Sequence, residues 1–312
     1  MEALLSFELC AGAGGQALGL AKAGFSHIGL VDNDPAACAT LRMNRPNWNV
    51  LETGLESIGL SNNPPLDLLA GGLPCPPFSI AGKQLGKDDE RNLFPDTLRL
   101  IEEANPKAIM IENVHGLLER RFDSYRTHIL GSLVQLGFIG EFKLFNAADF
   151  GVSQIRWRSV LVAMKPEYWV NFTWPNPSKK RSKTVGTLLF DLMGADGWQG
   201  VEEWKRGAND LAPTVVGGSK KHGGPDLGPS RARKSWAELG VDGLGIADAP
   251  PQQSFRGLPR LTPRMVARVQ SFADGWEFSG GKTAQCRQIG NAFPPPLAAA
   301  IGLQISTALR RV

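Results

Sequence analysis

The first 174 residues alternate short apolar runs with segments whose apolar residues recur every three or four positions. Strands that alternate with helices in this way are typical of a parallel β-sheet covered by helices. The expected strands are 4–9, 27–31, 66–70, 108–111 and 159–164, and the expected helices are 16–23, 35–43, 94–104 and 125–136. We therefore predict an α/β fold with a doubly wound, mostly parallel sheet, in which ligands bind beyond the carboxyl ends of the strands.

This pattern breaks at Trp174-Pro175-Asn176-Pro177, and the chain is then rich in Gly, Pro, Lys and Trp to about Pro259. We interpret this segment as a second, smaller and irregular domain. Regular structure is expected again where Thr262 can cap a helix that begins at Pro263, and a last helix is expected over 295–309. The predicted division is 1–174 plus 284–312 for the sheet domain and 175–283 for the small domain.

Composition and charge narrow the class of protein. Of the 312 residues, 42% are hydrophobic and 21% are charged, so the chain can bury a core and is not expected to be disordered. The net charge of +4 lies entirely in residues 175–260, which hold 13 Lys and Arg against 9 Asp and Glu, whereas the remainder holds 21 of each. This segment is a candidate phosphate-binding face, although a solvated surface has the same composition.

The cysteines and the termini point to a cytoplasmic protein. None of the four cysteines, Cys10, Cys38, Cys75 and Cys286, stands in a CxxC pair, so we expect neither a metal site nor a disulfide framework. The N-terminus lacks the basic region of a signal peptide, and no apolar run approaches about 18 residues. We therefore expect no membrane association.

A glycine-rich turn follows the first expected strand. Gly12, Gly14 and Gly15 would let the backbone approach a ligand, and the following helix N-terminus favours an anionic group such as a carboxylate. Asp32 ends the second expected strand, where an acid can accept hydrogen bonds from ribose hydroxyls. The GxGG spacing differs from the GxGxxG of dinucleotide sites, which favours S-adenosylmethionine over NAD. A glycine turn without any ligand is the plainer alternative.

The most informative segment is the loop around Cys75, which has proline on both sides and follows the expected strand 66–70. Most cysteines outside disulfides are small buried hydrophobes. Two further features favour a reactive thiol: Glu112 ends the neighbouring expected strand, and Gln154, Arg156 and Arg158 alternate so as to share one face. We therefore expect a thiol, a carboxyl group and guanidinium groups at one edge of the sheet.

These groups suit methylation of cytosine at carbon 5. A Cys75 thiolate that adds to carbon 6 makes carbon 5 nucleophilic, which is covalent catalysis. A protonated Glu112 can donate to ring N3, Arg158 can hold the base oxygen O2, and nearby Arg charge favours the thiolate. The target base must leave the duplex to reach such a pocket.

The same residues resemble the bacterial DNA (cytosine-C5) methyltransferase family of type II restriction-modification systems, from Phe7 to Pro296. The likeness consists of several motifs in the family's order, and this makes it specific. They are the Pro-Cys loop at Pro74 and Cys75, Glu112-Asn113-Val114, the QxRxR pattern at Gln154, Arg156 and Arg158, the RxLTxR-like segment from Arg260 to Phe272, and Gln288 to Pro294.

The resemblance implies roles for individual residues. The catalytic set is Cys75, Glu112, Arg158, Arg156 and Gln154. The implied S-adenosyl-L-methionine site, which would release S-adenosyl-L-homocysteine, comprises Glu8, Cys10, Ala11, Gly12, Gly15, Asp32, Asn33, Gly54, Leu55, Pro74, Leu93 and Asn291. The implied contacts to double-stranded DNA are Ser79 and Arg91, in the loop expected to close over DNA, and Lys220, Lys221, Arg231, Arg233 and Lys234 in the target-recognition domain. We expect no metal and a monomer, and a separately encoded restriction endonuclease is left open as a further partner.

The chain departs from the family pattern where adenine of the cofactor would be held. Cys10 stands where the family commonly has Phe, Asn33 replaces a bulky residue, and Gly54 replaces the usual Asp. Pro76 replaces Gln, Trp157 replaces an acid, and Met265 replaces another acid. None of these differences removes a catalytic group.

Three alternative functions use a similar scaffold. A tRNA cytosine-C5 methyltransferase would use the same catalytic parts, but its Cys-Phe-Thr signature is missing from this sequence. A non-catalytic DNA-binding protein is disfavoured because Cys75 and Glu112 are both present. Methylation of an exocyclic amine usually relies on an Asp/Asn-Pro-Pro-aromatic loop, and Cys75 stands where its acid or amide would be.

Overall fold

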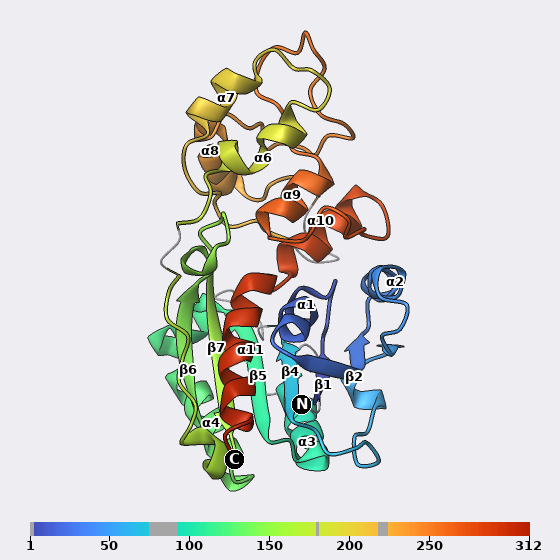
Figure 1. Ribbon diagram of the computed structural model, residues 1–312, viewed down its shortest axis with the longest axis vertical. Helices are drawn as coiled ribbons and strands as arrows, with labels where there is room; N and C mark the ends of the chain where they lie inside the picture. Colours follow the sequence, from blue (N-terminus) through green and yellow to red (C-terminus); the bar gives the residue numbers. More distant parts are fainter. Residues whose placement is uncertain (1–2, 75–92, 179–180, 218–223) are drawn as a thin grey trace.

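The computed structural model describes residues 3–74, 93–178, 181–217 and 224–312 (Figure 1). In these ranges seven strands form one sheet in the order β3-β2-β1-β4-β5-β7-β6. Neighbouring strands are parallel from β3 to β5, and β7 is inserted antiparallel between β5 and β6. The strands are β1 (Leu4–Leu9), β2 (Phe25–Asp32), β3 (Val50–Glu52), β4 (Leu68–Gly72), β5 (Ala108–Val114), β6 (Ile139–Asn146) and β7 (Trp157–Met164). The predicted doubly wound, mostly parallel fold is confirmed.

Helices cover both faces of the sheet. α1 and α11 pack on one face, in an apolar cluster with Leu68 and Met110, whereas α3 and α4 cover the other, with Leu69 and Ile109 of the same two strands (Figure 1). Because neighbouring residues of a strand point to opposite faces, both strands are apolar on both sides. The helices are α1 (Gly15–Lys22), α2 (Pro35–Asn44), α3 (Phe94–Ala104), α4 (Asp123–Gln135), α5 (Pro166–Trp169), α6 (Val185–Met193), α7 (Val201–Gly207), α8 (Ser230–Glu238), α9 (Pro263–Val269), α10 (Lys282–Asn291) and α11 (Pro295–Leu309).

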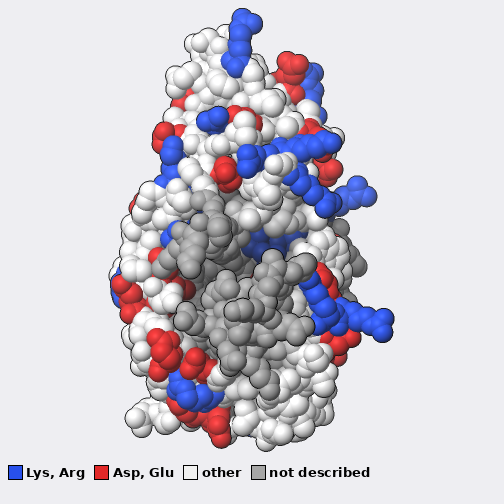
Figure 2. Space-filling view, turned by 180° about the vertical axis from the view of Figure 1, so that it is seen from behind, with Lys and Arg blue, Asp and Glu red and all other residues white. Residues whose placement is uncertain are grey.

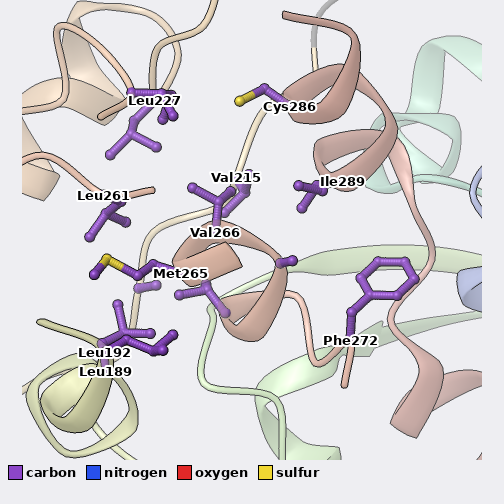
Figure 3. Packing of buried hydrophobic residues seen from close by; sticks show 14 of the residues in the cluster. Leu189, Leu192, Val215, Leu227, Leu261, Met265, Val266, Phe272, Cys286 and Ile289 are labelled. Atoms are coloured by element: carbon purple, nitrogen blue, oxygen red, sulfur yellow. The ribbon is translucent and has the colours of Figure 1, made fainter. Parts of the chain in front are cut away.

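A second group of helices lies beyond one end of the sheet. Figure 1 shows α6, α7 and α8 stacked there, with α9 and α10 between them and the sheet. A buried apolar cluster joins these helices, and Trp236 at its centre is completely buried. Figure 3 shows how side chains from α6, α9, α10 and the intervening loops converge: Leu189, Leu192, Val215, Leu227, Leu261, Met265, Val266, Phe272, Cys286 and Ile289.

Several predicted elements have the residue bounds that were expected, and one helix also has the N-terminal cap that was expected. The strand over 4–9 and the helices over 94–104 and 295–309 have the predicted bounds. Thr262 caps α9 as expected: its Oγ1 accepts a hydrogen bond from the Met265 amide at 3.3 Å, and Pro263 is the first helical residue.

Other elements were not predicted, because the hydrophobic periodicity of their sequences is weak. β6 is an edge strand whose side chains are mostly half-buried or exposed, so its apolar alternation is faint. α6, α7 and α8 lie in the segment that was expected to be irregular, and they pack in the cluster beyond the sheet rather than on the sheet itself. α10 is largely polar, and the predicted boundary between residues 283 and 284 falls inside it.

By length and composition alone, the stretch Lys282–Leu309 could cross a membrane, with a mean hydropathy of 1.2. It consists of two helices, α10 and α11, separated by Ala292 to Pro294. The most apolar part of this stretch is 61% buried inside the protein, and α11 packs against α1 and the sheet. The stretch is therefore part of the core.

Candidate active site

A cleft of about 660 Å³ opens at the carboxyl ends of the central parallel strands. Residues from the ends of β1, β2, β4 and β5 line it together with residues of α10 and the loop after it. Every residue predicted for the cofactor site lines this cleft: Glu8, Cys10, Ala11, Gly12, Gly15, Asp32, Asn33, Gly54, Leu55, Pro74, Leu93 and Asn291. Glu112 and Arg158, predicted as catalytic, line the same cleft.

The glycine-rich turn forms the floor of the cleft between β1 and α1. Cys10, Gly12 and Gly14 all have positive φ angles, of 51°, 53° and 84°. Glycine adopts such angles without strain, so the chain can turn sharply and begin α1 directly after the strand. At Gly15 a Cβ would lie 2.4 Å from the carbonyl oxygen of Phe293, so only glycine lets the C-terminal segment close this side of the cleft.

Asp32, at the end of β2, ties two loops of the cleft together. Its Oδ2 accepts a hydrogen bond from the Gly12 amide at 2.7 Å, and its Oδ1 accepts one from the Asp34 amide at 2.8 Å. These bonds fix the carboxylate at the edge of the cleft, next to the glycine turn. Arg287 of α10 lies nearby, paired with Asp34 at 3.0 Å.

Two polar side chains in the cleft wall are buried with unsatisfied hydrogen-bonding atoms among the described residues. Glu8 is 1% exposed and its Oε2 has no partner, and Gln16 is 4% exposed with neither amide atom bonded. Burial raises the pKa of Glu8 well above its usual range, although a hydrogen bond from the Ala17 amide opposes the shift. Because an unsatisfied buried polar group costs free energy, both side chains suit a polar ligand in the cleft.

Glu112 and Arg158 form a buried ion pair at the other end of the cleft. Arg158 Nε lies 2.7 Å from Glu112 Oε1, and the two residues are 8% and 7% exposed. Burial raises the pKa of Glu112, with Arg158 and Arg156 opposing the shift. Because Gly72 is paired with Glu112 in the sheet, the segment after β4 begins beside this carboxyl group.

Asn113 holds the start of the segment that carries Cys75. Its Nδ2 donates to the Leu73 carbonyl at 3.1 Å, and its Oδ1 accepts from the Val114 amide at 2.8 Å. Leu73 is two residues before Cys75, and Pro74 lines the cleft. Cys75 itself, like Ser79 and Arg91, lies outside the described residues.

Gln154 and Arg156 are placed elsewhere. As the alternation predicted, both lie on the same side of the chain as Arg158; all three are buried, whereas Ile155 and Trp157 are exposed. Neither side chain lines the cleft. Arg156 donates to the carbonyl oxygens of Val215, Gly290 and Ala292 at 2.9, 2.7 and 3.0 Å, and Gln154 bonds Val215 and Gln270.

These two residues therefore join three distant segments. Gln270 of the segment after α9 donates onward to the carbonyls of Ile289 and Ala292, at 3.0 and 2.8 Å. The network fixes the backbone on both sides of Asn291, which lines the cleft. The hydrogen bonds of Gln154 and of both Arg156 Nη atoms are made within this network, whereas Arg156 Nε has no partner among the described residues. The catalytic role expected for these two residues stays a prediction.

The basic residues predicted to contact DNA are only partly described. Arg231 and Lys234 are exposed, one helical turn apart on α8, whereas Arg233 is half-buried and its Nε donates to the Gly228 carbonyl at 2.6 Å. Lys220 and Lys221 lie outside the described residues. Figure 2 shows lysine and arginine side chains gathered over the upper part of one face.

Several residues of the cleft were not among the predicted site residues, and they include Gln16, Glu56, Arg287 and Phe293. Gln16 directly follows the glycine turn and could have been found from that position. Phe293 lies within the Gln288 to Pro294 motif and could have been found there. Glu56 lies after a strand that was not predicted, and Arg287 lies on a helix that was not predicted. No group of three or more His, Cys, Asp or Glu in the described ranges could hold a metal ion.

Known proteins are similar to this chain in both sequence and architecture. A family model described as C-5 cytosine-specific DNA methylase matches residues 4–307. Type II methyltransferase M.NaeI of Lentzea aerocolonigenes is 55% identical, covering 99% of this chain and 76% of that protein. Type II methyltransferase M.NgoMIV of Neisseria gonorrhoeae is 53% identical, covering 98% of each.

Solved structures of lower identity share the fold. A DNMT2 of Spodoptera frugiperda aligns with a TM-score of 0.68 at 16% identity, covering 97% of this chain and 100% of that one. A prophage-encoded methyltransferase of E. coli aligns with a TM-score of 0.70 at 22% identity, covering 99% and 100%.

The sheet has the Rossmann-like fold of these solved methyltransferase structures, and the family model over residues 4–307 places the chain in the methyltransferase class. Within that class, the chain belongs to the C-5 cytosine-specific DNA methylase family. Its activity is the methylation of carbon 5 of cytosine in DNA, and none of these similarities favours tRNA as the substrate.

Proposed function

We propose that the protein transfers the methyl group of S-adenosylmethionine to a cytosine flipped out of double-stranded DNA, leaving S-adenosylhomocysteine. The observation that carries this proposal is that one cleft unites the glycine turn, Asp32 and the Glu112–Arg158 pair. The unsatisfied atoms of Glu8 and Gln16 fit the charged amino-acid end of this cofactor, and the Asp32 carboxylate fits its ribose. When bound, the cofactor supplies an electrophilic methyl group.

The protein's own residues prepare the cytosine. The Cys75 sulfur would form a bond to carbon 6 as a thiolate, and the electron pair released into the ring is neutralised when Glu112 gives its proton to N3. Carbon 5 then acts as the nucleophile toward the methyl group. Loss of the carbon 5 proton to water and of the Cys75 sulfur as a thiolate restores the double bond between carbons 5 and 6. N3 then returns its proton to Glu112, which regenerates the aromatic ring and the enzyme.

Glu112 needs its proton for this step, and its surroundings favour that state. Burial is the largest influence on its pKa and raises it, and a base stacked into the cleft would exclude water further. Arg158 is paired with Glu112 through Nε and donates to the Trp157 carbonyl through Nη1, so its Nη2 would be directed toward the base oxygen O2. Asn113 positions the Cys75 segment through the Leu73 carbonyl.

The two parts of the molecule would have different functions. We infer that residues 1–174 and 284–312 bind the cofactor and perform catalysis, and that residues 175–283 recognise the DNA sequence. The surplus positive charge of this second part and the exposed Arg231 and Lys234 support this division. Arg233 is half-buried and its Nε is bonded within the protein, so its Nη groups would make the predicted DNA contact.

The biological setting follows from the relatives, which carry the names of type II methyltransferases. We propose that this protein is the modification enzyme of a restriction-modification system in the cytoplasm, acting as a monomer. A separately encoded restriction endonuclease that cuts the same DNA sequence would then be its counterpart.

Bisulfite sequencing of DNA from bacteria that express the protein tests the proposal. We expect protected cytosines confined to one short sequence motif, and none in cells expressing the Cys75→Ser variant. Full conversion of every cytosine in both samples, with the protein folded and abundant, would contradict the proposed function.

A further inference from the structure

Gly54 leaves a space in the cleft wall that another side chain fills. Gly54 follows β3 and caps the short 3₁₀ turn Leu55–Ser57. A Cβ at Gly54 would lie 2.1 and 2.2 Å from the two carboxylate oxygens of Glu56. The Glu56 carboxylate therefore occupies the position that a side chain of residue 54 would have, and it lines the cleft.

The strand order indicates which part of the cofactor lies there. Asp32, proposed to hold the ribose, ends β2, whereas the glycine turn, proposed to lie near the amino-acid end, follows β1. β3 is the outermost strand on the far side of β2 from β1. The group attached to the ribose on the side away from the glycine turn is adenine, so residues after β3 are placed to meet it.

Glu56 differs from the other acid of this segment. Glu52 is paired with Arg42 at 2.7 Å and does not line the cleft. Glu56 has no basic partner within salt-bridge distance among the described residues, and the hydroxyl of the adjacent Ser57 lies 3.5 Å from its Oε1. Its acceptor oxygens are available to a donor on a bound ligand.

We propose that Glu56 accepts a hydrogen bond from the exocyclic amino group of the cofactor's adenine. Its carboxylate thus provides the acceptor that Gly54, which has no side chain, does not provide. A carboxylate is an acceptor only, whereas the 6-position of adenine carries a donor and that of hypoxanthine carries a carbonyl acceptor. Glu56 therefore selects an adenosyl over an inosyl cofactor. This assignment rests on the proposed S-adenosylmethionine site.

Titration calorimetry with S-adenosylhomocysteine and S-inosylhomocysteine tests the assignment on the protein without DNA. The wild-type protein is expected to bind the adenosyl compound about tenfold more tightly or better, as befits a hydrogen bond to a charged acceptor. Glu56→Ala should reduce this preference about tenfold. Glu56→Gln should also reduce it, mainly through tighter binding of the inosyl compound, because its amide can donate to the carbonyl.

Two further variants sharpen the comparison. Glu52→Gln removes the neighbouring acid that lies off the cleft and should leave the preference unchanged. Gly54→Asp combined with Glu56→Ala restores a carboxylate at the same place and should recover the preference.

An adenosyl preference in Glu56→Ala equal to that of the wild type would overturn the assignment, as would a wild-type protein that binds both compounds equally. A folded wild-type protein that binds neither compound would instead contradict the proposed cofactor site, so the two failures are distinguishable. Melting curves would show that each variant is folded, and Glu56 is exposed enough for substitution to be tolerated.

Discussion

At the residue scale, the cleft concentrates polar groups that the protein alone does not satisfy. Glu112 is kept away from water and its pKa is raised, although Arg158 lies against it. Glu8 and Gln16 have unsatisfied buried atoms in the described structure. Buried polar groups without partners reduce stability, so their presence in one cleft indicates that the site is shaped for its ligands rather than for the folding of the protein alone.

Substitution of Glu112 by Gln should lower turnover by about 10²- to 10⁴-fold, the range of general acid catalysis, because the amide cannot give up a proton to N3. DNA binding, measured by fluorescence anisotropy, should change little. In the wild type, turnover should fall as the pH rises through the raised pKa of Glu112, because the proton is lost above it. Turnover of the Gln variant equal to that of the wild type would remove Glu112 from the chemistry.

Substitution of Gln16 by Leu should have opposite effects on stability and on binding. Removal of two unsatisfied amide atoms should raise the free energy of unfolding of the ligand-free protein by roughly 1–3 kcal/mol. The affinity for S-adenosylhomocysteine should fall about tenfold, whereas that for methylthioadenosine, which lacks the amino-acid end, should not change. A destabilised variant with unchanged affinity would mean that Gln16 has only a packing role.

At the element scale, Arg156 and Gln154 connect the segment before β7 to the segments around Val215 and Asn291. A single guanidinium satisfies three buried carbonyl oxygens, which come from parts of the chain that are far apart in sequence. The alternation in the sequence predicted that both residues share one face with Arg158, but it could not reveal that they are buried or what they contact. Their partners depend on the tertiary fold.

Arg156→Met should reduce the free energy of unfolding by about 3–5 kcal/mol, because it leaves the buried carbonyl groups of Val215 and Gly290 without a donor, while Ala292 keeps only the one from Gln270. It should also weaken S-adenosylhomocysteine binding, since the backbone on both sides of Asn291 is no longer supported. Arg121→Met, at an arginine whose side chain is 47% exposed, is the matched control and should change stability by less than about 0.5 kcal/mol. Denaturant titrations would measure both; an equal, small effect would contradict the structural role of Arg156.

The elements that the sequence predicted are those whose core positions follow a local pattern. α3 and α11 have apolar residues at helical spacing, and β1, β4 and β5 are short segments composed mostly of apolar residues. β3 has only three residues and α10 has few apolar ones, so neither has a periodic pattern to read. The motif residues predicted most of the residues that line the cleft. Glu56 and Arg287 were missed because Glu56 lies shortly after β3 and Arg287 lies on α10.

At the scale of the whole molecule, charge is divided unevenly between the two parts. The excess of positive charge lies in residues 175–260, and basic side chains gather on the upper part of the face in Figure 2. DNA phosphates attract such a surface, and the resulting binding weakens as the salt concentration rises.

Replacing Arg231 and Lys234 together by Ala should reduce the slope of log affinity against log salt by about 2, because each phosphate that is no longer neutralised lowers the slope by close to one. Replacing Lys22 and Arg311, two exposed basic residues at the end of α1 and at the C-terminus, should leave the slope unchanged. Binding of a duplex measured from low to high salt would distinguish these outcomes. Equal slopes in all three proteins would place α8 outside the DNA interface.

The central claim is that the Cys75 sulfur bonds to the target cytosine, and trapping of that bond is the most direct measurement. Fluorine at carbon 5 prevents the proton loss that releases the enzyme, so duplex DNA containing 5-fluorocytosine and S-adenosylmethionine should give a covalent complex. Mass spectrometry should place the nucleotide on the peptide that contains Cys75, and Cys75→Ser should give no complex. A complex that forms without Cys75, or methylated product with no complex at all, would contradict the account.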